Sequence, residues 1–391
     1  MSRQLIARSP DLQQLLNEGF DLEVRAGHLL IKDVPYVNSN REIKRGVLIS
    51  TLELNGDMTV PPANHVAMWT GEHPCHHDGR IISAITNPST GHDLGSDIRA
   101  DFTFSAKAAY RDYHHKVATY IGRITGEAKV IDPTVSANTF PVFETEEGES
   151  IFRYLDTATS RVGIGVMNER LSALKIAIIG LGGTGAYVFD FVAKTCVKEI
   201  HLYDGDVFSQ HNAFRSPGAA SIEELQGKPL KATYFAGIYA KMRRGIEPHE
   251  VFADENTTAL RHMDFVFLCL DRGAAKKAII KSLVEWGIPF VDVGMGILRA
   301  QDSLTGLMRV SCFGPGVDMA VLERIDYSDG ELPENEYSTN IQIVELNALN
   351  AALAVVMWKK RYAIYRDSSR ASSFSYSIAA NEMANDDKDA A

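Results

Sequence analysis

Short apolar runs alternate with amphipathic segments between residues 174 and 313, and this alternation predicts an α/β domain. Apolar runs with β-branched residues suit strands that are buried on both faces of a parallel sheet. Such runs lie at residues 175–179, 197–203, 265–271, 288–293 and 304–313. Between the first two runs, residues 186–195 place Val188, Phe189 and Val192 on one side of a helix. The domain therefore opens with a β-α-β unit.

The C-terminal third of the chain shows a helix and then a polar tail. Gly294-Met295-Gly296 is expected to end the strand at 288–293. Residues 343–361 predict a long helix, and its apolar stripe is expected to pack in the core. That stripe consists of Leu346, Leu349, Leu353 and Val356. Polar residues dominate afterwards, so residues 366–391 are expected to form a flexible tail.

Residues 1–145 have a different pattern and predict a separate, smaller α+β domain. Helices are expected at residues 11–19 and 106–121. Strands are expected at residues 22–24, 28–37, 42–54, 66–69 and 80–85. Residues 144–150 are acidic and contain glycine, which is typical of a linker, so a second domain is expected over residues 151–365.

Glycines follow the strand at 175–179 and predict a nucleotide-binding turn. They are Gly180, Gly182, Gly183 and Gly185. Glycine lets the backbone turn sharply and approach a phosphate closely, and a helix N-terminus offers unpaired N–H groups to that phosphate. Asp204 ends the next strand, where a carboxylate can accept hydrogen bonds from ribose hydroxyls. The alternative is a glycine turn that only lets helix and strand pack.

The residues after Asp204 carry a family resemblance. The run from Asp204 through Asp206 to Arg215 resembles the D-x-D-x-V…S-N-L-x-R signature of the ThiF-type adenylyltransferases, the family that includes ubiquitin-activating enzymes. Asn212 and Arg215 stand at the matching offsets. Residues 227–231 resemble the family's G-x-P-K with one extra residue, which leaves Lys231 or Lys228 as the catalytic lysine. We favour Lys231 because it opens the next helical pattern.

Further positions extend the resemblance on both sides of this signature. Asp271 ends a buried strand, and Lys276 stands five residues later, where the family carries arginine. Residues 152–161 resemble the family's lead-in, whose arginine reaches across a dimer to ATP. This comparison assigns that role to Arg161. Residues 1–145 resemble an uncharacterised domain that precedes bacterial ThiF-type modules.

The resemblance implies a fold and a reaction. The fold is a Rossmann-like ThiF-type adenylation domain preceded by a smaller α+β domain. The reaction is ATP-dependent adenylation of the C-terminal carboxylate of a ubiquitin-like protein by a homodimer. Arg215 and Lys231 would contact the phosphates, Asp204 the ribose, and Asn212 phosphate or metal. Asp271 would hold Mg²⁺, a cation that prefers carboxylate oxygen. The N-terminal domain would recruit the ubiquitin-like protein or a conjugating partner.

Composition and charge indicate which kinds of partner and which cellular location to expect, but they do not identify a partner. The 391 residues carry a formal net charge of −10, which argues against a nucleic-acid partner. No apolar run is long enough to predict a membrane span. The four cysteines, at 75, 196, 269 and 312, are scattered, which favours a reducing cytoplasm.

None of the cysteines lies in an obvious exposed loop, so the acyl group is expected to pass to a cysteine or hydroxyl outside this chain. Cys312 is the remaining internal candidate after the adenylation core. Cys75 lies in a His-rich stretch at 72–79, where a polar turn is expected. The alternatives are a zinc site, although the adjacent ligands are cramped, and a catalytic thiol.

Two other classes of protein share this opening pattern. An NAD- or FAD-dependent oxidoreductase uses the same glycine turn, but nothing in the sequence marks a nicotinamide site. A non-catalytic binding module can keep the nucleotide fold as a scaffold. The joint presence of Arg215, Lys231 and Asp271 argues against the scaffold.

Overall fold

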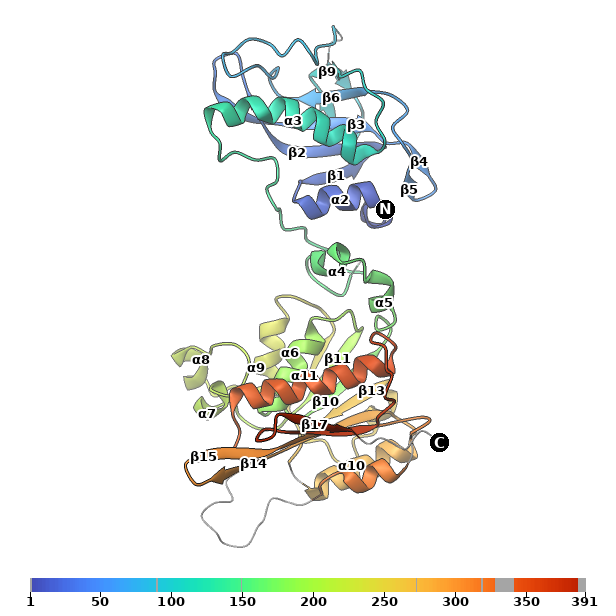
Figure 1. Cartoon of the computed structure of the whole chain (residues 1–391), viewed down its shortest axis with the longest axis vertical. Coiled ribbons are helices and arrows are strands. Elements are labelled where there is room, and N and C mark those ends of the chain that lie inside the picture. The colour runs from blue at the N-terminus through green and yellow to red at the C-terminus, as the bar shows by residue number, and fades with distance from the viewer. Residues whose placement is uncertain are drawn as a thin grey trace. The chain divides into compact units, whose positions relative to one another are not determined.

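The computed structural model describes residues 2–88, 91–148, 150–271, 273–317, 319–327 and 341–385. The chain divides into two compact units, which Figure 1 shows with their elements labelled. The first contains Met1–Phe143 and Asp156–Gly163, and the second contains Glu144–Leu155 and Ile164–Ala391. The acidic segment expected to be a linker thus belongs to the second unit, while the short helix α4 (Thr157–Arg161) belongs to the first.

The first unit is an α+β domain built on an antiparallel sheet. The strand order is β1-β2-β3-β6-β9. These strands are β1 (Leu22–Arg25), β2 (His28–Val37), β3 (Ile43–Thr51), β6 (Val66–Thr70) and β9 (Phe102–Ser105). The helices of this unit, besides α4, are α1 (Ser2–Arg8), α2 (Pro10–Glu18) and α3 (Tyr113–Ile131). The unit also contains two short antiparallel pairs of strands, β4 (Leu54–Asn55) with β5 (Met58–Thr59) and β7 (His92–Asp93) with β8 (Arg99–Ala100).

Two expected elements of this unit differ from the structure. Residues 80–85 form turns instead of a strand, with isolated bridges that join Cys75 to Val37 and to Ile81. The long helix begins at Tyr113 instead of residue 106, because the Asp112 side chain accepts a hydrogen bond from the His115 N–H at 2.7 Å and caps the helix there.

The second unit contains an eight-stranded sheet of order β12-β11-β10-β13-β14-β15-β16-β17. The first five strands are parallel and the rest pair antiparallel. They are β10 (Lys175–Ile179), β11 (Glu199–Tyr203), β12 (Ile246–His249), β13 (Phe265–Leu268), β14 (Phe290–Ala300), β15 (Ser303–Phe313), β16 (Ser373–Ser377) and β17 (Glu382–Asn385). This is the α/β fold with a Rossmann-like parallel core that the pattern predicted.

Helices cover both faces of this sheet (Figure 1). One core cluster joins the sheet to α6 (Gly183–Ala193), α9 (Lys231–Tyr239) and α11 (Val344–Arg361). The other cluster joins the opposite face to α10 (Gly273–Glu285) and the short helices η1 (Thr258–His262) and η2 (Met319–Arg324). The remaining short helices are α5 (Gly165–Glu169), α7 (Gln210–Ala213) and α8 (Ile222–Gln226). Among the described residues, no helix is long and apolar enough to cross a membrane.

Strand β14 runs through the glycines expected to end it. Gly294 pairs with Arg309 and Gly296 with Leu307 on β15. An added Cβ at Gly294 would lie 2.7 Å from the Arg309 guanidinium, so the glycine leaves room for that side chain. The ladder continues because both glycines keep extended backbone and their neighbours supply the hydrogen bonds.

The expected flexible tail contributes two strands to the sheet. β16 pairs with β15 and β17 pairs with β16, so the ordered fold continues to Asn385. The prediction of a flexible tail from the polar sequence was wrong for these strands, because backbone hydrogen bonds to an existing sheet edge do not require apolar side chains. Residues 386–391 of the expected tail lie outside the described residues.

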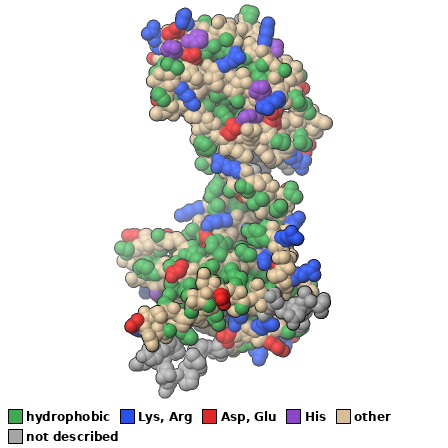
Figure 2. All heavy atoms as spheres, in the orientation of Figure 1, with side chains coloured by type: hydrophobic (Ala, Val, Ile, Leu, Met, Phe, Trp, Pro, Cys, Tyr) green, Lys and Arg blue, Asp and Glu red, His purple; other side chains and the backbone are tan. Residues whose placement is uncertain are grey.

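The apolar stripe of α11 faces the core only in part, since Leu353 packs partly buried against it. Leu349 and Val356 are 37% and 40% exposed. The buried residues are Asn347, Asn350, Ala351, Ala354, Val355, Met357 and Trp358. Small alanines let α11 approach the sheet closely, whereas Leu346 and Leu353 are half-buried and Leu349 is exposed. Figure 2 shows hydrophobic side chains gathered on the face of the second unit where α11 lies.

Candidate functional site

The candidate site lies at the carboxyl ends of the parallel strands. β10 has β11 on one side and β13 on the other, so the direction of the sheet's winding changes between β10 and β13. Ligands of open α/β sheets bind at such a point. Residue Gly180 follows β10, Asp204 follows β11 and Asp271 follows β13 after two further residues.

The four glycines have two different roles. Gly180 has φ +88°, and an added Cβ there would lie 2.6 Å from the Cys269 carbonyl oxygen. Gly183 and Gly185 are equally closed in by neighbouring atoms. At Gly182, no described atom lies within 4 Å of the Cβ position, and no side chain caps the start of α6. A phosphate therefore has room at Gly182, where the helix presents its N–H groups.

Asp204, Asp206 and Lys231 form one charged group beside this turn. Asp204 is 5% exposed and accepts hydrogen bonds from the N–H groups of Leu181 (2.6 Å) and Asp206 (2.9 Å). The Lys231 ammonium is 2.8 Å from Asp206 Oδ2 and 3.7 Å from Asp204 Oδ1. The carboxylate predicted to bind ribose thus also holds the glycine turn in place.

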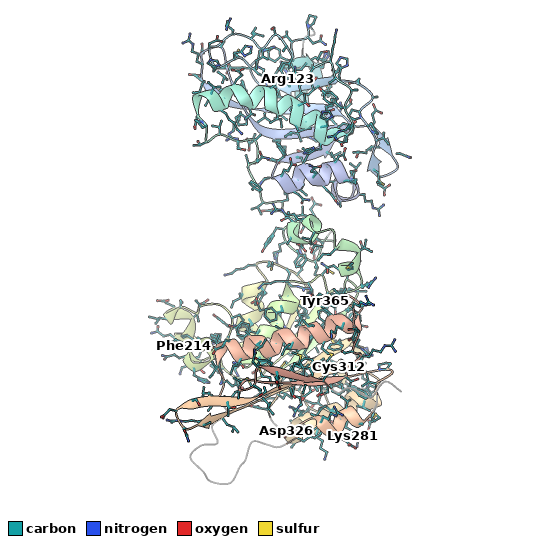
Figure 3. The ribbon with its side chains drawn as sticks, in the orientation of Figure 1. Arg123, Phe214, Lys281, Cys312, Asp326 and Tyr365 are labelled. Carbon is teal, nitrogen blue, oxygen red and sulfur yellow. The ribbon has the colours of Figure 1, made fainter. Side chains whose placement is uncertain are left out.

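The structure separates the two candidate lysines. Lys231 is the first residue of α9 and is 7% exposed. Lys228 is exposed, has φ +47°, and lines a cavity of about 790 Å³ with residues of α7 and α8 and with Phe214, which follows α7 and is labelled in Figure 3. Only Lys231 is held at the predicted ribose carboxylate.

Arg215 and Asp271 approach each other from separate segments. Burial lowers the pKa of the half-buried Arg215, and the nearby charge of Asp271 opposes that shift. The Arg215 Nε is buried without a hydrogen-bond partner among the described residues. A cation with unused donors beside an acid suits a phosphate that shares a divalent cation.

Asn212 has a structural partner of its own. It is 3% exposed, and its Oδ1 accepts hydrogen bonds from the N–H (3.0 Å) and hydroxyl (2.9 Å) of Ser209. These bonds cap α7 and fix the turn that leads to Arg215. The structure thus shows Asn212 shaping the loop, and contact with phosphate or metal stays a prediction.

Arg161 lies in the first unit. Its Nη2 donates to the Asn17 carbonyl oxygen at 3.1 Å, and α4 packs against α2 there. The other predicted site residues belong to the second unit, and contact of Arg161 with ATP stays a prediction.

Sequence reasoning missed Asn347 of α11. It is fully buried, accepts a hydrogen bond from the Thr184 hydroxyl at 3.0 Å, and donates to the Arg215 carbonyl at 3.4 Å. It therefore ties the first turn of α6 to the loop that carries Arg215. Asparagine at positions 347 and 350 of an otherwise apolar helix was the available signal.

Metal binding at this site depends on Asp271. The described residues contain no cluster of three or more His, Cys, Asp or Glu arranged for a metal. Mg²⁺ in nucleotide sites is commonly held by one or two carboxylates together with the phosphates, so a single acid beside the open glycine turn fits that cation.

The cysteines are not arranged as nucleophiles. Burial raises the pKa of Cys312, which is 5% exposed, to about 11. Burial also raises the pKa of Cys269 and of Cys75. The Cys196 thiol donates to the Asn168 carbonyl oxygen at 2.8 Å. A thiol with a raised pKa supplies little thiolate at neutral pH.

This fold and site define a nucleotide-binding α/β domain, and sequence comparison gives its family. Residues 157–304 match the ThiF family, and residues 10–157 match a domain of unknown function (DUF6791). The chain therefore carries a ThiF-family domain preceded by a separate N-terminal domain, as the motifs predicted. No curated protein matches the chain in sequence.

Several solved structures are similar to part of the chain. Escherichia coli MccB with MccA-N7isoASN is 15% identical, with a TM-score of 0.44 over 59% of this chain and 69% of MccB. The same enzyme with ATP is 17% identical, with a TM-score of 0.43 over 57% of this chain and 66% of MccB. PaaA is 17% identical, with a TM-score of 0.43 over 59% of this chain and 80% of PaaA.

Proposed function

We propose that the chain is an ATP-dependent adenylyltransferase that activates the C-terminal carboxylate of a ubiquitin-like protein. The observation that carries this proposal is the convergence at one edge of the sheet. Three features lie together at the carboxyl ends of adjacent strands. They are the open turn at Gly182, the ion pair of Asp204 with Lys231, and the neighbouring charges of Arg215 and Asp271. The family match supports the same reaction class.

The proposed reaction joins two anions. A carboxylate oxygen attacks the α-phosphorus of ATP, the bond from that phosphorus to the bridging oxygen breaks, and pyrophosphate leaves with the electron pair. Lys231 and Arg215 bring positive charge to the phosphates, and Asp204 accepts from the ribose hydroxyls. Asp271 holds Mg²⁺, which when bound neutralises phosphate charge. The Gly182 N–H and the start of α6 orient the phosphates.

Several finer assignments belong to this proposal. The enzyme acts in the cytoplasm as a homodimer, with Arg161 of one copy reaching the phosphates of the other. The N-terminal domain recruits the ubiquitin-like protein or a conjugating partner. The acyl group passes to an acceptor outside this chain, because its buried thiols have raised pKa values. Neither nucleic acid nor membrane takes part.

The test first identifies the genes that neighbour this one, because the proposal expects a ubiquitin-like protein to be encoded there, and it uses that protein as the substrate. With Mg²⁺ and this partner, the enzyme should exchange labelled pyrophosphate into ATP. The same partner with its C-terminal carboxylate converted to an amide should give no exchange, because no nucleophile remains. Absence of exchange with the intact partner, or tight binding of NAD⁺ in calorimetry, would contradict the proposal.

A further inference from the structure

A buried ion pair with a second cation lies one strand away from the candidate site. Asp292, near the start of β14, is fully buried. Its Oδ1 is 3.0 Å from the Lys276 ammonium, and its Oδ2 is 3.4 Å from Arg309 Nη2. Burying an unpaired carboxylate here would be costly, so at least one of these cations is needed for folding.

The two cations come from different elements. Lys276 is 4% exposed and belongs to the first turns of α10, five residues after Asp271. Arg309 comes from β15, which pairs with β14 and does not lead to Asp271. Only Lys276 links Asp292 to the helix that follows the candidate metal ligand.

β14 also supports the strand on the other side of Asp271. Asp292 pairs with Leu268, the last residue of β13, and the next N–H, of Cys269, donates to the Ile179 carbonyl at 2.8 Å. The β13 ladder therefore holds the residues before Asp271, and the Lys276–Asp292 ion pair holds the first turn of α10 after it.

We propose that Lys276 and Asp292 are positioning residues that orient Asp271 for Mg²⁺. This rests on the proposed function, in which Asp271 is the metal ligand. A buried apolar pair would hold α10 at least as firmly, so stability alone does not account for an ion pair at this place. The charge contact of 3.0 Å between the Lys276 ammonium and Asp292 Oδ1 draws the first turn of α10 toward β14, and the position of this turn sets the position of Asp271, which precedes α10 by two residues.

The test compares Lys276→Met with Arg309→Gln, since each removes one cation from Asp292. ATP binding to the full-length chain is measured by calorimetry across a Mg²⁺ series and in EDTA. Lys276→Met should weaken the apparent Mg²⁺ affinity about tenfold while leaving ATP affinity in EDTA unchanged, as supporting residues of metal sites do. Arg309→Gln should stay near wild type, and Lys276→Arg should restore the Mg²⁺ affinity.

Two controls guard against a trivial loss of structure. Lys281→Met changes an exposed lysine of the same helix, labelled in Figure 3, and should have no effect. If Lys276→Met does not fold, Lys276→Met with Asp292→Leu gives an apolar pair that should fold yet keep the weakened Mg²⁺ affinity. Melting curves accompany every variant.

Each outcome decides between explanations. Equal losses in Lys276→Met and Arg309→Gln, or full Mg²⁺ affinity in the folded apolar pair, would overturn the positioning role. Wild-type protein that binds ATP equally with Mg²⁺ and with EDTA would instead contradict the assignment of Asp271 and the proposed function.

Discussion

The Lys231 ammonium lies 2.8 Å from the Asp206 carboxylate, and the Lys231 N–H also donates to the Asp206 carbonyl oxygen at 2.9 Å. This double contact joins the start of α9 to the turn after β11. It holds a nearly buried lysine beside Asp204, at the edge of the sheet where the glycine turn is open. The extra residue in the motif therefore does not move the lysine away from the site.

Lys231 and Lys228 should differ sharply on substitution. Lys231→Met should reduce pyrophosphate exchange at least about 100-fold, because a fixed positive charge at the phosphates is lost. Lys228→Met should change the rate only slightly, since Lys228 lies on an exposed turn beside the 790 Å³ cavity. The reverse order of effects would assign the catalytic lysine to residue 228.

Stability of the first unit should depend on pH through Glu127. Its oxygens lie 2.8 Å from His76 Nδ1 and 2.9 Å from His77 Nδ1, and one accepts from the His77 N–H at 3.0 Å. Burial works to raise the pKa of Glu127, but these hydrogen bonds outweigh it and lower the pKa to about 2. The folded state thus binds this proton less readily than the unfolded state.

The sign of the effect follows from linkage. A depressed folded pKa gives stability that is present above the unfolded value, near 4.5, and is lost as the pH falls toward 2. Urea titrations should therefore find Glu127→Gln less stable than wild type at pH 7, with a difference that shrinks between pH 4.5 and 3. A difference that does not change over this range would show that Glu127 does not titrate with folding.

Arg243 should be a major determinant of stability in the second unit. It is fully buried, and its guanidinium donates to the carbonyl oxygens of Thr195 (3.1 Å), Arg244 (2.9 Å) and Val197. Arg243→Met should lower the free energy of unfolding by ~3 kcal/mol, because these buried acceptors lose their donor. Denaturant titration measures this, and the exposed Lys241→Met is the matched control. Equal stability of both variants would contradict this role.

An adduct with the ubiquitin-like partner should not be a thioester to this chain. Thiols with raised pKa at Cys75, Cys269 and Cys312, and the hydrogen-bonded Cys196, are poor nucleophiles. A variant without all four cysteines should therefore still form the acyl adenylate, measured as pyrophosphate exchange, once melting curves show that it folds. A reductant-sensitive adduct that vanishes with Cys312→Ala alone would identify an internal nucleophile.

Local sequence determined the elements whose backbone N–H groups are proposed to bind the phosphates. The strand, glycine turn and helix at 175–193 follow from neighbouring residues, because glycine conformations and helix starts depend on a few positions along the chain. The acid at 204 and the two candidate lysines at 228 and 231 could likewise be found from the sequence. The α/β fold and the separate α+β domain were therefore predictable from the order of residues, and the ThiF type from the resemblance of the motifs to that family.

Tertiary packing decided what spacing left open. Periodicity gave α11 a hydrophobic stripe but not its direction, and contact with α6 and β14 buried Asn347 and Asn350 while Leu349 and Val356 stayed exposed. Polar strands β16 and β17 form because an existing sheet edge supplies their partners.

The choice of Lys231 over Lys228 required the distance from Lys231 to Asp206. The Lys276–Asp292 pair likewise joins residues from separate elements. Such long-range contacts have no period in the sequence, because they depend on how elements that are distant along the chain pack against each other.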